Sequence, residues 1–455
     1  MKLYNTLGRK KQELKPIKDD VVRFYACGPT VYNYAHLGNL RSYVFMDLLR
    51  KSIEYFGFDV NLVVNITDVG HLTDDADQGE DKMEKSARKQ NKSVWDIAKY
   101  YTREFKKDVK ALNIKKPDTW CKATDHIEEQ IKLVELMEEN GYTYKTSDGI
   151  YFDTSKLNDY GKLVPNFNPE NLDAGSRVDM KEKRNKTDFA LWKFSGEDEK
   201  RQMEWESPWG KGFPGWHIEC TAMACKYLGK KFDLHTGGID HIPVHHTNEI
   251  AQAQGAFGDD HVKYWMHSEF LKVGSGKMSK SKGNFLRLQT IKDKGFHPLD
   301  YRYFLLQAHY RKPQMFSWEA LEAAKSARKN LVRKIQKIVG ETKTVDNEFK
   351  ERFKDAVGDD LNVPKALSIL HDVLDSDLVD EVKYGLVLDF DKVLGLKLGE
   401  VKPFTVPVEI VELARKRQRL REEKRFDEAD KIRNEIKTKG FVVKDAGDGF
   451  EIEEG

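Results

Sequence analysis

Two cysteines, two adjacent histidines and a glutamate carry side chains of the kind that bind a transition metal. Cys27 ends a predicted strand, and Cys220 lies on a predicted helix. His245 and His246 precede Glu249 by four and three residues, so on a helix either could share a face with the carboxylate. Two thiolates, an imidazole and a carboxylate match the ligand preferences of zinc. The spacing predicts a metal site without choosing the histidine, and the alternative is that both cysteines are buried apolar residues.

A second group of residues is suited to phosphate. The segment HLGN places His36, Gly38 and Asn39 at the start of a predicted helix, just after a predicted strand. A helix N-terminus offers free N–H groups and the positive end of the helix dipole. Gly38 allows a ligand to approach the backbone, and His36 and Asn39 can donate hydrogen bonds to phosphate oxygens. Taken alone, the segment fits packing or helix capping equally well.

A third group lies in the segment KMSKS, residues 277–281, in a loop flanked by glycines. Lys277 and Lys280 on such a loop can follow negative charge as it develops on a triphosphate. The alternative is an ordinary solvated basic loop. The sequence has no GxxxxGK[ST] segment, which weakens the case for a P-loop enzyme.

The elements around these residues predict a doubly wound α/β domain. An apolar run ends at Gly28, residues 36–55 have helical spacing, and DVNLVVNITD returns as a buried strand, which makes a βαβ unit. After an interruption from about residue 95 to 206, the helix CTAMACKYLG and the strand KFDLHTGG resume the pattern. Ligands of such folds bind beyond the carboxyl ends of the strands. Beyond Pro298 the pattern is almost wholly helical and ends in a basic helix pair and a small hairpin.

The composition is that of a multidomain protein with a charged surface. The chain has 455 residues, 39% of them hydrophobic and 33% charged, and two to four domains are expected. No apolar run is long enough to span a bilayer, and the N-terminus lacks the apolar core of a signal peptide. Four cysteines in so long a chain are not a disulfide framework, so we expect a cytoplasmic protein with no membrane association. A net charge of +2 still allows a local basic patch for nucleic acid.

Several segments, taken together, resemble the class I aminoacyl-tRNA synthetases. HLGN and KMSKS stand where that class has its two signatures, at opposite ends of a split α/β domain. The blocks FYACGPTVYNYAHLGN, NITD, DFALWK, PGWHIECTAM, HHTNEIAQ, KMSKSKGN, DDLNVPKAL and FDEADKIRNEI resemble the cysteinyl-tRNA synthetase family, from about Leu3 to Glu454. The resemblance implies ATP-dependent activation of L-cysteine to cysteinyl-adenylate and transfer of the cysteinyl group to tRNA(Cys).

The resemblance also implies a domain order, in which a Rossmann-like catalytic domain is split by an insertion and followed by a helical bundle. The expected ranges are the first catalytic half (1–108), a connective insertion (109–206), the second catalytic half (207–270), the KMSKS loop with a stem-contact region (271–318), a helical anticodon-binding domain (319–400) and a small basic tRNA-binding region (401–455).

The family's functional positions fall on matching residues of this chain. The implied ligands of one zinc ion per chain are Cys27, Cys220, His245 and Glu249, so the resemblance chooses His245 over His246. The implied cysteine pocket consists of Cys27, Gly28, Thr67, Trp216, His235 and Asp240, with Asp240 suited to the ammonium group. The implied catalytic and ATP-binding residues are His36, Gly38, Asn39, Lys277 and Lys280, with Mg²⁺ accompanying ATP.

Two departures from the family pattern qualify these assignments. Asn39 stands where the family has the second histidine of its signature, and its amide still donates a hydrogen bond, although the pH response would differ. The C-terminal ending GDGFEIEE replaces the usual GTxW, which leaves the contacts of the anticodon region open.

The metal is expected to supply specificity for the amino acid. Serine and alanine nearly match cysteine in size, and shape alone discriminates by only about 1–3 kcal/mol per methylene-sized difference. Zinc prefers a thiolate, so we expect the sulfur of the substrate to bind the metal directly. A purely structural zinc, closed by four protein ligands, is the alternative.

Two other functions compete with the synthetase interpretation. One is an ATP-dependent cysteine ligase that acts on a small amino-sugar acceptor, and the other is a non-catalytic RNA-binding paralogue. The long helical tail and the dense basic stretch from Arg415 to Arg425 favour a tRNA partner over a small acceptor. The expected partners are tRNA(Cys), ATP and L-cysteine, and a monomer is expected.

Overall fold

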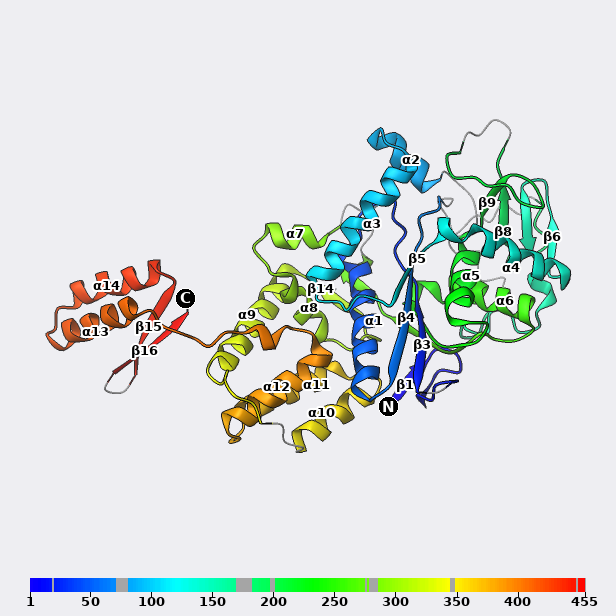
Figure 1. The fold of residues 1–455 in the computed structure, drawn as a ribbon. Coiled ribbons are helices and arrows are strands. Elements are labelled where there is room, and N and C mark those ends of the chain that lie inside the picture. The colour runs from blue at the N-terminus through cyan, green and yellow to red at the C-terminus, as the bar shows by residue number, and fades with distance from the viewer. Residues whose placement is uncertain are drawn as a thin grey trace.

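The structure is a computed structural model that describes residues 1–18, 20–70, 81–168, 182–196, 201–274, 276–277, 285–343, 348–446 and 449–454. An α/β part holds most of the first half of the chain, a helical part lies beside it, and a small module ends the chain beyond an extended segment (Figure 1). Among the described residues, no helix combines the length and apolar character needed to cross a membrane.

A parallel sheet forms the frame of the α/β part and confirms the predicted doubly wound fold. Its order is β11–β10–β3–β4–β5, and each neighbouring pair is parallel. Both β3 and β4 are buried toward their carboxyl ends, as expected for strands covered on two faces. The strands are β3 (Val21–Ala26), β4 (Asp59–Ile66), β5 (Thr119–Lys122), β10 (Phe232–Gly238) and β11 (Val262–Ser268).

Helices cover the two faces of this sheet. Alternate side chains of a strand point to opposite faces, so Phe24 packs in the core that includes α1 (Leu37–Tyr55), whereas Tyr25 packs in the core that includes α5 (Trp216–Leu228). Helix α6 (His245–Phe257) packs against α5. The predicted βαβ unit and the predicted helix after residue 216 are therefore confirmed, and they meet at the carboxyl ends of β3 and β10.

A helical pair and an antiparallel sheet lie between the halves of the α/β part. The pair is α2 (Lys82–Gln90) and α3 (Val94–Ala111), and the sheet consists of β6 (Thr143–Lys145), β7 (Gly149–Phe152), β8 (Phe189–Phe194) and β9 (Gly212–Pro214), with α4 (Ile127–Glu139) beside it. Strand β5 falls inside the range predicted as the insertion, 109–206, yet it pairs with β4. The antiparallel sheet of the insertion begins only at β6.

The helical part confirms the pattern seen beyond Pro298. Its helices are α7 (Leu288–Asp293), α8 (Pro298–Leu306), α9 (Trp318–Gln336), α10 (Glu348–Gly358), α11 (Val363–Asp375) and α12 (Asp380–Leu394). A small three-stranded sheet also belongs to this region and consists of β12 (Leu271–Val273), β13 (Gly276–Lys277) and β14 (Gln314–Phe316). A buried ion pair fastens this part to α1, because Arg302 Nη2 lies 2.6 Å from Asp47 Oδ2. The two parts therefore share one continuous core.

The N-terminal end of the chain packs into the main core, whereas the C-terminal end forms a small module. Strands β1 (Lys2–Asn5) and β2 (Lys10–Glu13) pair as a hairpin near the N-terminus. The C-terminal module consists of α13 (Val408–Glu422), α14 (Phe426–Thr438), β15 (Phe441–Ala446) and β16 (Gly449–Glu454), and it has a small hydrophobic core of its own. This confirms the predicted basic helix pair and hairpin, which follow the extended segment in Figure 1.

Candidate metal and nucleotide site

The predicted metal ligands converge where β3, α5 and α6 meet. Cys27 follows β3 directly and is half-buried, whereas Cys220 on α5 and His245 and Glu249 on α6 are buried. One ligand atom from each of these four residues lies within 4.8 Å of the other three. The structure thus brings together two thiols, an imidazole and a carboxylate that the sequence separates by up to 222 residues.

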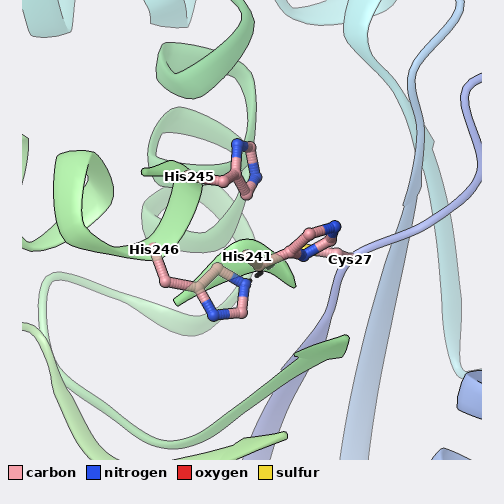
Figure 2. A group of neighbouring side chains, drawn as sticks. All are labelled: Cys27, His241, His245 and His246. Carbon is pink, nitrogen blue, oxygen red and sulfur yellow. Dashed lines mark hydrogen bonds between the residues drawn. The ribbon is translucent and has the colours of Figure 1, made fainter. Parts of the chain in front are cut away.

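The same neighbourhood contains two competing groups of ligand atoms. Cys27 also lies within this distance of His241, His245 and His246, which Figure 2 draws, and of His235, His246 and Glu249. His246 Nε2 is 3.3 Å from the sulfur of Cys27, and its Nδ1 is 2.7 Å from His267 Nε2. The geometry therefore supports a metal-binding centre that includes Cys27, while both adjacent histidines remain within reach.

The pKa shifts of the buried groups favour the binding of a cation. Burial alone would raise the pKa of Glu249, but the charges and hydrogen bonds of His235 and His245 hold it well below its usual value. Burial opposes protonation of His245, yet Glu249 and Cys220 raise its pKa to about 10. A hydrogen bond from Cys27 lowers the pKa of the Cys220 thiol to about 7, whereas burial raises the pKa of Cys27 itself. Glu249 is thus held as an anion, the form in which a carboxylate binds a metal, and Cys220 ionises more easily than an ordinary thiol.

The surroundings of the Glu249 carboxylate show whether the site suits a metal ion. Glu249 Oε2 is 2.9 Å from His235 Nε2, while Oε1 faces the two adjacent histidines of α6. This Oε1 lies 3.0 Å from His245 Nε2, close to the spacing of about 3.3 Å between two ligands of one tetrahedral zinc. A buried carboxylate is costly unless a cation lies against it, and two thiols, an imidazole and a carboxylate at this spacing form a donor set that fits a zinc ion.

A cavity of about 540 Å³ opens above the cluster. Its wall includes five of the residues predicted for the cysteine pocket, namely Cys27, Gly28, Thr67, Trp216 and Asp240, as well as the ligands Cys220 and His245. A Cβ atom at Gly28 would meet the Asn65 carbonyl oxygen at 1.6 Å, so only glycine fits there. His235 does not line the cavity and lies buried behind the cluster, where it holds Glu249. His235 therefore supports Glu249 from behind and does not form part of the pocket wall, where it was predicted.

The HLGN segment forms the N-terminal cap of α1 at the edge of the same cavity. The Asn39 N–H donates to His36 Nδ1 at 3.0 Å, and the His36 N–H donates to Asn39 Oδ1 at 3.2 Å. Both residues also line the cavity, and Gly38 lies between them. Helix capping and phosphate binding are thus compatible roles for this segment, because the capping residues themselves line the cavity.

The start of α1 also holds both sides of the KMSKS region. The Leu37 N–H donates to the Leu286 carbonyl at 2.8 Å, and the Arg41 guanidinium donates to the carbonyls of Phe270 and Lys312. The backbone of Lys277 belongs to β13, whereas its side chain and the whole of Lys280 lie outside the described residues. The roles predicted for these two lysines therefore stay predictions.

Comparison with known families agrees with this geometry. A model described as the class I (C) tRNA synthetase catalytic domain matches residues 13–326, and one described as the cysteinyl-tRNA ligase anticodon binding domain matches residues 406–452. Cysteine–tRNA ligase 1 of Burkholderia lata is 51% identical over 98% of this chain and 95% of its own. Cysteine–tRNA ligase of Treponema denticola is 45% identical over 98% of both chains. The chain belongs to the cysteine–tRNA ligase family.

A solved structure shares the fold of this chain. Methionyl-tRNA synthetase of Mycobacterium tuberculosis, bound by methionyl-adenylate, superposes with a TM-score of 0.59 at 16% identity and covers 84% of this chain and 93% of its own. The anticodon-binding description matches the C-terminal module, and the anticodon-binding domain expected at residues 319–400 stays a prediction.

Sequence reasoning missed two histidines beside the candidate metal ligands, His217 and His267. His217 Nδ1 lies 2.9 Å from His245 Nδ1, and His267 Nδ1 lies 2.7 Å from Thr6 Oγ1 while its other nitrogen meets His246. A signal was present, because seven of the 13 histidines of the chain lie between residues 217 and 267. Such clustering on two helices and two strands points to one shared location.

Proposed function

We propose that this chain is a cysteine–tRNA ligase that activates L-cysteine with ATP and transfers the cysteinyl group to tRNA(Cys). The main support for this proposal is the cluster of Cys27, Cys220, His245 and Glu249 at the floor of the cavity. The N-terminus of α1 lies at the edge of the same cavity. The names of the relatives support the same activity. A small amino-sugar acceptor would leave the C-terminal module, with its anticodon-binding description, without a use.

The cluster is the proposed holder of one zinc ion. Cys27, Cys220, His245 and Glu249 would hold it, since this is the group of possible ligands that has two thiols. Bound there, zinc would supply a Lewis acid that favours a thiol over a hydroxyl as an additional ligand. The preference for cysteine over serine then rests on chemistry rather than on the size of the pocket.

Residues of the cavity wall are proposed to orient the amino acid. Asp240 is exposed on the wall, so its carboxylate can pair with the ammonium group of cysteine. Trp216, whose ring is 4.7 Å from that of His245, is proposed to cover the side chain and keep water from it. Thr67 and Gly28 complete a small pocket beside Cys27.

The nucleotide is proposed to bind at the edge formed by α1. His36 and Asn39 donate to the phosphates, Gly38 admits them close to the backbone, and Lys277 and Lys280 neutralise charge on the leaving pyrophosphate. Mg²⁺ bound to ATP is expected for the same electrostatic reason. No enzyme nucleophile is needed, because the carboxylate of cysteine attacks the α-phosphate and alignment supplies the catalysis.

Two assays with purified protein test this proposal. Pyrophosphate exchange that depends on cysteine, is not supported by serine and falls when a chelator is added is the expected result. Attachment of cysteine to tRNA then separates a synthetase from a ligase acting on an amino-sugar acceptor. A protein that binds RNA but lacks exchange in the presence of zinc would be a non-catalytic paralogue, and the proposal would fail.

A further inference from the structure

A buried polar side chain, that of Asn65, lies near the carboxyl end of β4. Alternate side chains of a strand share a face, and two residues earlier Val63 packs in the apolar core that includes α5. Packing alone would favour a residue such as valine at this position, yet Asn65 is only 1% exposed. Burying an amide costs stability unless its oxygen and nitrogen are hydrogen-bonded, so the contacts of this amide indicate what it does.

The amide of Asn65 joins two segments of the cavity wall. Its Oδ1 accepts a hydrogen bond from the Gly28 N–H at 2.6 Å, and its Nδ2 donates to Thr67 Oγ1 at 3.0 Å. The Thr67 hydroxyl in turn donates to the buried carboxyl of Glu219 on α5. A chain of hydrogen bonds therefore runs from the segment after β3, across the end of β4, to the helix that carries Cys220.

Backbone contacts hold the same two segments together. The Thr67 N–H donates to the Pro29 carbonyl at 3.1 Å, and the Val31 N–H donates to the Thr67 carbonyl at 3.2 Å. The segment after β3 thus lies directly against the end of β4. Asn65 lines the cavity together with Gly28 and Thr67. A change in the Asn65 side chain therefore acts at once on two residues that are proposed to surround the amino acid.

We infer that Asn65 is a positioning residue for the amino-acid pocket and acts through Gly28 and Thr67. The inference rests on the proposed function, in which these two residues lie beside bound cysteine. The Asn65 amide occupies one lone pair of Thr67 Oγ1 and Glu219 takes its proton, so the other lone pair is left to accept from the ammonium group of cysteine. Without the amide, the Thr67 hydroxyl can rotate, and the pocket loses a fixed acceptor that acts in addition to Asp240.

Pyrophosphate exchange by the full-length, zinc-replete protein tests the inference, with cysteine and ATP varied separately. Asn65→Val removes both hydrogen bonds and supplies a side chain of the kind that this face of β4 accommodates at Val63. The kcat/KM for cysteine should fall about 10-fold, the effect of losing one hydrogen bond to a charged group. The KM for ATP should change by less than about twofold, because the proposed phosphate-binding groups lie on α1.

A double-mutant cycle shows whether Asn65 acts through Thr67. Thr67→Val keeps the shape of the side chain and removes the hydroxyl, so its kcat/KM for cysteine should also fall about 10-fold. The variant with both substitutions should be about as weak as Asn65→Val alone, because the two changes remove the same acceptor. Asn61→Ala is the matched control, since Asn61 is half-buried at the other end of the same strand, and it should leave both constants unchanged.

Several results would overturn the inference. An unchanged kcat/KM for cysteine in Asn65→Val, losses that multiply in the double variant, or equal losses for cysteine and ATP would each do so.

Thermal unfolding and metal analysis check that Asn65→Val keeps its fold and its zinc. If it does not fold, Asn65→Ser, whose side chain is too short to reach both partners, must show the same selective loss. Absence of exchange in the wild type would refute the proposed function, while calorimetric titration of both proteins with cysteine, which needs no catalysis, would still decide the inference.

Discussion

The floor and the edge of the cavity present their reactive groups in opposite ways. On the floor, Cys220, His245 and Glu249 are buried on two packed helices, and each contacts another ionisable group. At the edge, His36 is half-buried and Asn39 is exposed at the end of a single helix. The groups proposed to select the amino acid are thus fixed by the core, whereas those proposed to bind phosphate depend on a helix end and a nearby loop. Selection needs rigid geometry, and phosphate handling must follow charge that moves during the reaction.

The largest effect is expected from disrupting the floor. Glu249→Gln keeps the shape of the side chain but removes the charge that His235 and His245 surround. We expect bound zinc to be lost and cysteine-dependent pyrophosphate exchange to fall to background, a decrease of more than about 100-fold. Metal analysis of the purified variant and the exchange rate measure both. Gln254→Ala, on a less buried position of α6, is the matched control and should retain metal. A metal-replete, active Glu249→Gln protein would contradict the account of the floor.

A smaller effect is expected from breaking the buried ion pair that fastens α1 to the helical part. Arg302 and Lys51 outweigh the effect of burial and keep the pKa of Asp47 below its usual value. Because this pKa is depressed, the stabilisation is present above the unfolded pKa of about 3.9 and is lost as pH falls through the folded value. Asp47→Asn should therefore cost about 3 kcal/mol of unfolding free energy at pH 7. The difference from the wild type should shrink below about pH 4.

Denaturant unfolding at several pH values measures this difference. The exposed pair of Arg352 and Asp372 provides the control, since Asp372→Asn should cost less than about 1 kcal/mol. If the two variants lost the same stability, or if the loss in Asp47→Asn did not vary with pH, the buried pair would not be what fastens α1.

The smallest of these effects is expected at the edge itself. His36→Ala removes one donor to phosphate and one side of the α1 cap, so the kcat/KM for ATP should fall about 10-fold, equivalent to ~1.5 kcal/mol. Asn39→His restores the signature usual in the family and should keep activity, while adding a titrating group to the pH profile. The exchange reaction at varied ATP concentration and pH measures both. An unchanged kcat/KM for ATP in His36→Ala would exclude this cap from a role with the nucleotide.

The sequence predicted what short-range patterns determine. The strand–helix–strand unit of β3, α1 and β4 follows from apolar periodicity, and the C-terminal helices follow from their helical pattern and dense charges. The short β5 was placed in the insertion, because four residues of TWCK carry little strand signal without their pairing to β4. The pair of Asp47 and Arg302 joins residues 255 positions apart, which no local pattern can reveal.

For the site, the sequence identified the ligand types but not their final arrangement. Helical spacing allowed either His245 or His246 to join Glu249, and in the fold both lie within ligand distance of Cys27. Only the resemblance to a family preferred His245. His235 was expected in the pocket wall, yet it lies behind Glu249, because the depth of a side chain depends on the packing of β10 against α6.

The central claim, that a buried metal selects the thiol of cysteine, is tested most directly by the absorption spectrum of the cobalt-substituted enzyme. Addition of cysteine should strengthen the thiolate-to-cobalt absorption, and addition of serine should not, because only the thiol forms a bond that the metal prefers. A protein without stoichiometric metal, or a spectrum that cysteine leaves unchanged, would contradict the claim.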